Sequence, residues 1–321
     1  MARALILGMG SIGTVYALIL NNADVDLVCI CRSNFEEAQT AGFKVRSSVF
    51  GDHTIRPKIA RSVADAVAID DKHFDFVLVC TKSFPGSQNS TVQALEPALQ
   101  SSSTMIVLLQ NGLGVESDYR TRYPNNPIIS GVVYMPTTKI SANEVVHTEV
   151  EKLFIGSYPA SQKAAPGAHQ LADLFSRGGA TVQVEDDVQV ERWKKIVANG
   201  CWNPVCALSA CRDVAFLGVS PLALGFVRSI MEEICAVAAA VGYEKSINNE
   251  TVDFQMARSA ARSWPGVEPS MMSDMKAGAR MEVEAIIGSI VRIAKEKSLE
   301  VPRLETLYLL LAGLSSSVES K

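Results

Sequence analysis

Hydrophobic positions follow two different patterns in the two parts of this chain. Up to about residue 187 the chain has short, nearly continuous apolar runs, which are typical of strands buried in a parallel sheet. The clearest runs are Ala4–Leu7, Val25–Cys31, Phe74–Cys80 and Thr104–Leu109. From Val188 onward the long apolar patterns have helical spacing instead. We therefore predict an α/β domain over residues 1–187 and an all-α domain over residues 188–321.

Weaker patterns complete this outline. Phe43–Val49 and Thr54–Ile59 alternate around a turn and are expected to extend the sheet. Further short strands and one helix are expected before the boundary, at Pro127–Tyr134, Glu144–Thr148, Lys152–Ile155, Leu171–Arg177 (the helix) and Val182–Glu185. Beyond it the expected helices are Val188–Ala207, Pro221–Val241, Glu250–Arg262, Glu282–Lys297 and Glu305–Leu314. The Ser-rich end after Leu314 is expected to be frayed.

A glycine motif lies between the first apolar run and the helical pattern that follows it. Gly8, Gly10 and Gly13 have G-x-G-x-x-G spacing, with Met9, Ser11 and Ile12 between them. In a strand, turn and helix context, such glycines allow a tight turn, close approach of a pyrophosphate and close packing of helix on strand. Backbone amides at the helix start then hold the anion. The motif predicts a Rossmann-type dinucleotide site.

Composition removes several other classes of function. The N-terminal run could be read as a secretory signal after Arg3, but glycines and Ser11 interrupt it and no cleavage site is convincing. A net charge of -4 disfavours binding to nucleic acid. The uncharged run from Ile196 to Cys211 is too short and too polar for a membrane span. Seven cysteines without zinc or redox spacing are expected to be reduced and buried, which favours a cytoplasmic protein without a metal site.

Polar residues follow three of the buried strands. Arg32 stands where an NAD-preferring unit carries an acidic residue, and a guanidinium suits the 2′-phosphate of NADP(H), although Arg32 could also be a solvated charge. Lys82 and Asn111 follow the next two strands. Asn111 and Gly112 could also form a turn that has no role in binding. Ligands of open parallel sheets bind at this edge, so we expect the three side chains to meet the cofactor or its substrate.

A polar stripe marks the first helix of the second domain. Lys195, Asn199 and Asn203 recur at i, i+4 and i+8 and therefore share one helix face. They could cap or bridge neighbouring helices, or they could line a cleft against the nucleotide domain. In the second case, Lys195 would protonate a ketone oxygen, because a partly desolvated ammonium near other cations has a lowered pKa. The histidines lie at less suitable places, so a histidine acid is not evident.

With these residues, the chain resembles the ketopantoate reductase (2-dehydropantoate 2-reductase) family over nearly its whole length. The similarity includes the glycine motif, Arg32, Thr81-Lys82, Gln110-Asn111-Gly112, the segment from Trp193 to Pro204, and the Ser270 to Asp274 and Arg280 to Glu284 segments. It implies a Rossmann-type domain followed by an all-α domain like that of 6-phosphogluconate dehydrogenase. It also implies NADPH-dependent reduction of 2-dehydropantoate to (R)-pantoate, on the way to pantothenate. The family is often dimeric, so a homodimer is one assembly that it allows.

The resemblance also implies roles for individual residues. Lys195 resembles the family's general acid, and Asn111, Asn199, Asn203 and Ser270 fall at positions that bind the keto acid. Lys82 and Asn111 match residues near the nicotinamide ribose. Glu282 resembles a glutamate that contacts the cofactor, and Thr137 falls at a cofactor-loop position.

Three departures from the family pattern leave the substrate open. Asp213 replaces an asparagine and would repel a substrate carboxylate unless a cation compensates. Val267 stands where a polar residue is common, and Ile287 replaces another asparagine. Two alternatives therefore remain: a reductase of a different branched or aromatic 2-keto acid, or a non-catalytic NADP-binding sensor.

Overall fold

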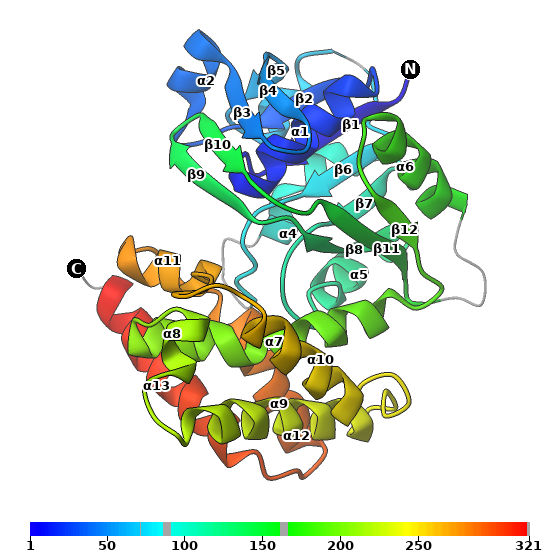
Figure 1. Ribbon diagram of the computed structural model, residues 1–321. Coiled ribbons are helices and arrows are strands. Elements are labelled where there is room, and N and C mark those ends of the chain that lie inside the picture. Colours follow the sequence, from blue (N-terminus) through cyan, green and yellow to red (C-terminus); the bar gives the residue numbers. More distant parts are fainter. Residues whose placement is uncertain (71, 86–90, 161–165, 320–321) are drawn as a thin grey trace. The chain divides into compact units, whose positions relative to one another are not determined.

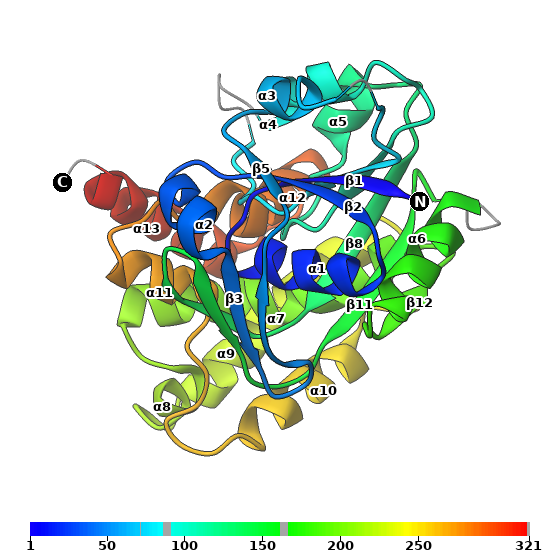
Figure 2. The same ribbon diagram turned by 90° about the horizontal axis from the view of Figure 1, so that it is seen from above.

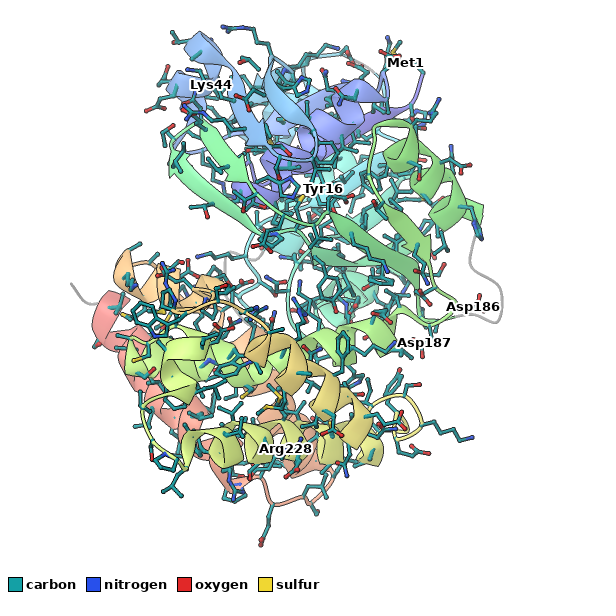
Figure 3. The ribbon with its side chains drawn as sticks, viewed as in Figure 1. Met1, Tyr16, Lys44, Asp186, Asp187 and Arg228 are labelled. Carbon is teal, nitrogen blue, oxygen red and sulfur yellow. The ribbon has the colours of Figure 1, made fainter. Side chains whose placement is uncertain are left out.

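The computed structural model describes residues 1–70, 72–85, 91–160 and 166–319. The chain forms two compact units (Figure 1). The nucleotide unit comprises Met1–Asn111 and Val115–Val188, and the helical unit comprises Gly112–Gly114 and Gln189–Lys321. Asp186 and Asp187 lie at the end of the nucleotide unit, just before the chain enters the helical unit (Figure 3).

An eight-stranded sheet forms the centre of the nucleotide unit. Its order is β12-β11-β8-β7-β6-β1-β2-β5. The strands are β1 (Arg3–Leu7), β2 (Asp26–Ile30), β5 (Lys58–Ala60), β6 (Phe76–Val79), β7 (Met105–Leu108), β8 (Ile128–Tyr134), β11 (Lys152–Tyr158) and β12 (Val182–Val184). From β5 to β8 all neighbours are parallel, and β11 pairs with β8 in the antiparallel sense. Because the order reverses at β1, the carboxyl end of β1 is the sheet's topological switch point.

Helices cover both faces of this sheet, which explains why its central strands are almost continuously apolar. In β1, Ala4 and Ile6 belong to the core beneath α1 (Ser11–Asn22) and α6 (Pro166–Arg177), where Tyr16 packs against Phe175. Leu5 and Leu7 face the opposite core, as period-two alternation requires. That core is covered by α3 (Val63–Val67), α4 (Thr91–Ala94), η1 (Glu96–Ala98) and α5 (Ser117–Arg122). Figure 2 shows the two helical layers, and Figure 3 shows Tyr16 inside the unit.

A second, four-stranded sheet corrects one expectation. Phe43–Val49 and Thr54–Ile59 were expected to extend the main sheet, but β3 (Phe43–Ser47) and β4 (Gly51–Ile55) form a separate sheet in the order β4-β3-β10-β9. Its other strands are β9 (Thr137–Ser141) and β10 (Glu144–His147). Phe43 and Val45 of β3 are buried, whereas Lys44 and Arg46 are exposed. A strand with one solvated face fits a sheet that packs on one side only, here in the core of α1. Of the two expected strands, only Lys58 and Ile59 join the main sheet, in β5.

The helical unit contains every long helix predicted after the boundary (Figure 1). These are α7 (Val188–Ser209), α9 (Ala223–Ala240), α10 (Asn249–Ala260), α12 (Ser289–Glu296) and α13 (Pro302–Glu319). Ile196, Ile230 and Ile290 are fully or almost fully buried in their shared core. No helix in the described part of the chain combines the length and the apolar character needed to cross a membrane.

Three details of the helical unit differ from the sequence prediction. The expected helix at Glu282–Lys297 begins with a π-helical turn, η2 (Glu284–Gly288), before α12. The expected frayed end is wrong, because α13 continues past Leu314 to Glu319, with Ser315 buried. Short helices α8 (Asp213–Leu217) and α11 (Ser270–Lys276) were not predicted, because each is too brief to show a helical period.

Candidate active site

The glycine turn joins β1 to α1 at the switch point of the sheet. Gly8 has a φ of +105° and lies against the chain after β6, where a Cβ would come within 2.7 Å of the Thr81 nitrogen. A Cβ on Gly13 would lie only 2.0 Å from the Gly8 oxygen. At Gly10, by contrast, an added Cβ would meet no atom within 4 Å. Gly8 and Gly13 therefore allow the turn to fold, whereas Gly10 leaves open space above it.

The residues between these glycines begin the helix. Met9 is buried, and Ser11 and Ile12 form the first, partly exposed turn of α1. The buried Asn34 donates a hydrogen bond from Nδ2 to the Met9 oxygen at 3.1 Å. Asn34 thus fixes the turn from the segment after β2, a role that the sequence did not indicate.

Three predicted polar residues lie at the carboxyl edge of the sheet. Arg32, Lys82 and Asn111 follow β2, β6 and β7, which run parallel to β1 and end at the same edge. Arg32 and Lys82 are exposed and Asn111 is half-buried. The topology therefore brings all three to the edge that carries the glycine turn. Thr137 lies elsewhere, at the start of β9 in the small sheet, where its hydroxyl donates to the Met135 oxygen at 2.8 Å.

A hydrogen-bonded brace joins the ends of β6 and β7. Gln110 donates from Nε2 to the Thr81 oxygen at 3.0 Å and accepts from the Tyr119 hydroxyl at 3.1 Å. This brace fixes Thr81 and Gln110, the residues just before Lys82 and Asn111. Tyr119 belongs to α5 and has no sequence signal that would link it to this edge.

A pocket of about 540 Å³ opens beside the ends of β1 and β2. Two arginines, Arg32 and Arg61, line it. Its remaining lining consists of Leu7, Ile30, Ser62, Val63, Ala64, Gln93, Ala94, Glu96, Pro97 and Gln100. Apolar walls with a few polar groups suit a planar, charged ligand such as the adenosine end of a dinucleotide.

In the helical unit, α7 carries the predicted polar stripe. Lys195 and Asn199 are partly exposed, and Asn203 is buried. The Nδ2 atom of Asn203 is buried and has no hydrogen-bond acceptor among the described residues. A buried donor without an acceptor is costly, so it favours a polar ligand at this face. Ser270 is the exposed first residue of α11, on a separate element of the same unit.

The pKa of the Lys195 ammonium is lowered to about 7. Desolvation by the surrounding protein is the largest cause, and the positive charges of Arg192 and Arg258 add to it. The carboxylate of Glu282 opposes the shift. Glu282 is buried just before the π-helical turn. The lowered pKa expected from the sequence is found, and a pKa near neutrality suits a residue that transfers protons.

Arg192 also has a structural contact in the helical unit. It is buried one turn before Lys195 on α7 and donates a hydrogen bond to the Gly112 oxygen at 3.0 Å. Leu113 donates in turn to the Ala285 oxygen in the π-helical turn at 3.1 Å. No motif in the sequence marks Arg192 as part of a site.

Asp213 is compensated by a cation. Its side chain is buried and forms an ion pair with Arg262, which is 28% exposed. It also accepts hydrogen bonds from the backbone of Val214 at 2.9 Å and of Val267 at 2.7 Å. Ile287 is fully buried in the helical core. Asp213 and Ile287 therefore have structural roles that account for two of the departures from the family pattern.

We expect Asp213→Ala to lower the free energy of unfolding by about 2–3 kcal/mol, because it leaves Arg262 and the Val267 amide without their acceptor. The matched control is Asp253→Ala, which breaks the more exposed ion pair with Arg228 on α9. Arg228 is labelled in Figure 3. The control should cost at most about 1 kcal/mol. Urea unfolding followed by circular dichroism measures both, and equal losses would show that Asp213 is not a structural clamp.

Comparison with known proteins identifies the family. Residues 4–160 match the family "Ketopantoate reductase PanE/ApbA", and residues 187–315 match its C-terminal counterpart. A 2-dehydropantoate 2-reductase from Nostoc sp. is 26% identical over 94% of this chain and 92% of its own length. An uncharacterized protein of Saccharomyces cerevisiae is 28% identical over 100% of this chain and 96% of its own length.

Solved structures agree with this assignment. The 2-dehydropantoate 2-reductase from Methylococcus capsulatus has a TM-score of 0.87 at 30% identity, covering 99% of this chain and 98% of its own. A D-mandelate dehydrogenase solved with NADH and anilino(oxo)acetate shares the fold, with a TM-score of 0.83 at 20% identity and 98% and 99% coverage. The predicted fold class, a Rossmann-type domain followed by an all-α domain, is confirmed. The chain belongs to the ketopantoate reductase family and is an oxidoreductase.

Proposed function

We propose that this protein reduces 2-dehydropantoate to (R)-pantoate with NADPH, as a cytoplasmic step toward pantothenate. The observation that carries the proposal is the environment of Lys195, whose pKa of about 7 lets it hold and release a proton at working pH. The open space at Gly10 and the pocket beside Arg32 fit a dinucleotide. When bound, the cofactor supplies the hydride.

The chain's own residues supply the proton and the binding of the keto acid. Lys195 donates the proton from Nζ to the ketone oxygen, which becomes the hydroxyl of the product. Asn199 and Asn203 offer carboxamide groups to the substrate, and the unsatisfied Nδ2 of Asn203 supports this role. Ser270 and Asn111 are proposed to bind the keto acid as well, and Lys82, Asn111, Glu282 and Thr137 to contact the cofactor.

Two of the departures do not argue against 2-dehydropantoate. The charge of Asp213 is neutralised by Arg262, so it need not repel a carboxylate, and Ile287 is part of the core. Val267 is exposed, and its backbone amide donates a hydrogen bond to Asp213. A panel of 2-keto acids, branched and aromatic, should give the highest kcat/KM with 2-dehydropantoate, as followed by loss of NADPH absorbance. A higher kcat/KM for another keto acid would identify that acid, and not 2-dehydropantoate, as the substrate. Tight NADPH binding without turnover of any keto acid would favour the sensor.

Arg32→Ala should shift cofactor preference. We expect kcat/KM for NADPH to fall about 10- to 100-fold, because the 2′-phosphate loses a charge-assisted, bidentate partner. The value for NADH should change less than about threefold, since NADH has no 2′-phosphate. Steady-state kinetics with both cofactors at one keto acid concentration give the ratio. An equal loss of kcat/KM with both cofactors would show that Arg32 does not recognise the 2′-phosphate.

A further inference from the structure

The pocket beside β1 and β2 contains a second guanidinium that the proposed function does not use. Arg61 directly follows Ala60, which pairs with Ile30 in the parallel ladder between β5 and β2. Arg32 comes two residues after Ile30, so the register of the two strands brings both arginines to one pocket. Their separation of 29 positions in the sequence hides this arrangement.

Arg61 is held in place by the helix that follows Arg32. In α2 (Phe35–Ala41), the Phe35 ring lies under the guanidinium, with 3.9 Å between the Arg61 Cζ atom and the ring centroid. Glu36, the next residue, forms an ion pair with Arg61 Nη2. Cation–π stacking and an ion pair together restrict a side chain that would otherwise be mobile. The Arg61 side chain is still 55% exposed, so a ligand in the pocket can reach it.

The charges around Arg32 and Arg61 favour binding of a ligand group with two negative charges. Arg32, Arg61 and Glu36 sum to one positive charge, and Glu36 engages Arg61 through a single nitrogen, Nη2. A guanidinium has five N–H donors, so Arg61 keeps donors for a second acceptor. A phosphate monoester carries about -1.5 to -2 charges at pH 7 and three acceptor oxygens, enough for two guanidinium groups. Glu96, the carboxylate lining the pocket, is itself paired with Arg122.

We propose that Arg61 is a second specificity-determining residue, which binds the cofactor's 2′-phosphate together with Arg32. This inference rests on the proposed use of NADPH. Phe35 and Glu36 are positioning residues, because they act on the phosphate only through Arg61. The 2′-hydroxyl of NAD(H) carries no charge, so it cannot form the charge-assisted hydrogen bonds that the two guanidinium groups offer to a 2′-phosphate.

Binding of adenosine fragments tests the inference without turnover. Isothermal titration calorimetry on the full chain compares 2′,5′-ADP with 5′-AMP, which differ only in the 2′-phosphate. Arg61→Ala should lower the affinity for 2′,5′-ADP about 5- to 20-fold, as expected for loss of one charge-assisted pair. The affinity for 5′-AMP should stay within about twofold of the parent value. The affinity of Arg61→Lys for 2′,5′-ADP should lie between those of the parent and Arg61→Ala, since lysine keeps the charge but loses the planar, two-pronged donor geometry and the stacking on Phe35. The matched control, Arg56→Ala, removes an exposed arginine of the same unit that does not line the pocket, and should leave both ligands unchanged.

The outcomes separate this inference from the proposed function. If Arg32→Ala weakens 2′,5′-ADP but Arg61→Ala does not, Arg61 has no part in recognition and the NADPH proposal stands. If Arg61→Ala weakens both ligands equally, its role is structural and the inference is overturned. If the parent protein itself binds 2′,5′-ADP no better than 5′-AMP, the proposed NADPH preference fails first. Thermal unfolding of each variant confirms that a folded protein is being titrated.

Discussion

Lys195→Ala will lower kcat for keto acid reduction by about 100- to 10,000-fold, the usual contribution of a general acid. The loss follows because a methyl group cannot protonate the oxygen that becomes negative as hydride arrives at the carbon. The matched control is the adjacent Lys194→Ala. Lys194 is paired with Glu191 at 2.6 Å, and helix geometry places it about 100° around α7 from Lys195, so its removal should change kcat less than about twofold. A Lys195→Ala variant as fast as the parent would refute the assigned acid.

The pH dependence gives an independent measure of the same residue. The proton donor is the ammonium, so kcat/KM for reduction should be constant below the Lys195 pKa of about 7 and fall tenfold per pH unit above it. In the direction of alcohol oxidation the neutral amine is needed, so the rate should rise through the same pKa. Lys195→Arg, whose guanidinium stays charged, should be slow and lack this decline. A decline that persists in Lys195→Arg would belong to another group.

Gly13→Ala will damage both stability and cofactor binding. The added methyl would lie 2.0 Å from the Gly8 oxygen and 3.2 Å from the Cys80 Cβ, so α1 must move away from the turn. Overpacking of this kind costs about 1–3 kcal/mol in a well-packed core, and more where backbone must move. Distortion of the turn should also lower the affinity for NADPH at least about tenfold, because the backbone amides at the start of α1 lose their alignment.

Gly10→Ala is the matched variant at the same turn. An added methyl meets no protein atom within 4 Å, so the free energy of unfolding should stay within about 0.5 kcal/mol of the parent. The affinity for NADPH should still fall at least about tenfold, since the methyl group occupies the space through which the pyrophosphate approaches the backbone. Urea unfolding and NADPH fluorescence titration measure the two properties separately. Unchanged NADPH affinity in Gly10→Ala would mean that the dinucleotide does not cross this turn.

Local patterns predicted the elements well where one physical signal was sufficient. The buried strands β1, β6 and β7 were visible because strands covered on both faces are continuously apolar. The stripe on α7 was visible because helical spacing alone places Lys195, Asn199 and Asn203 on one face. The separate sheet was missed, because alternation in β3 shows a solvated face but does not show which strands become its neighbours.

The electrostatics of the site could not be predicted in the same way. The partner of Asp213 is Arg262, 49 residues later, and only the folded helices bring the two together. Similarly, the pKa of Lys195 depends on Arg258 and Glu282, which come from elements far from α7 in the sequence. Arg61 has no motif around it, and its place in the pocket follows from the register of two strands. Long-range contacts of this kind carry no local signal.

The segment Gly112–Gly114 has a consequence for any attempt to divide this protein. Its three residues belong to the helical unit, through the Leu113 amide on Ala285 and the Gly112 oxygen on Arg192, although they lie between two stretches of the nucleotide unit. A gene cut after residue 188 would therefore encode no complete unit. The first fragment would carry a loop without its acceptors and donors, and the second would leave the buried guanidinium of Arg192 without that carbonyl. Swapping the helical unit between relatives requires transplanting this tripeptide as well.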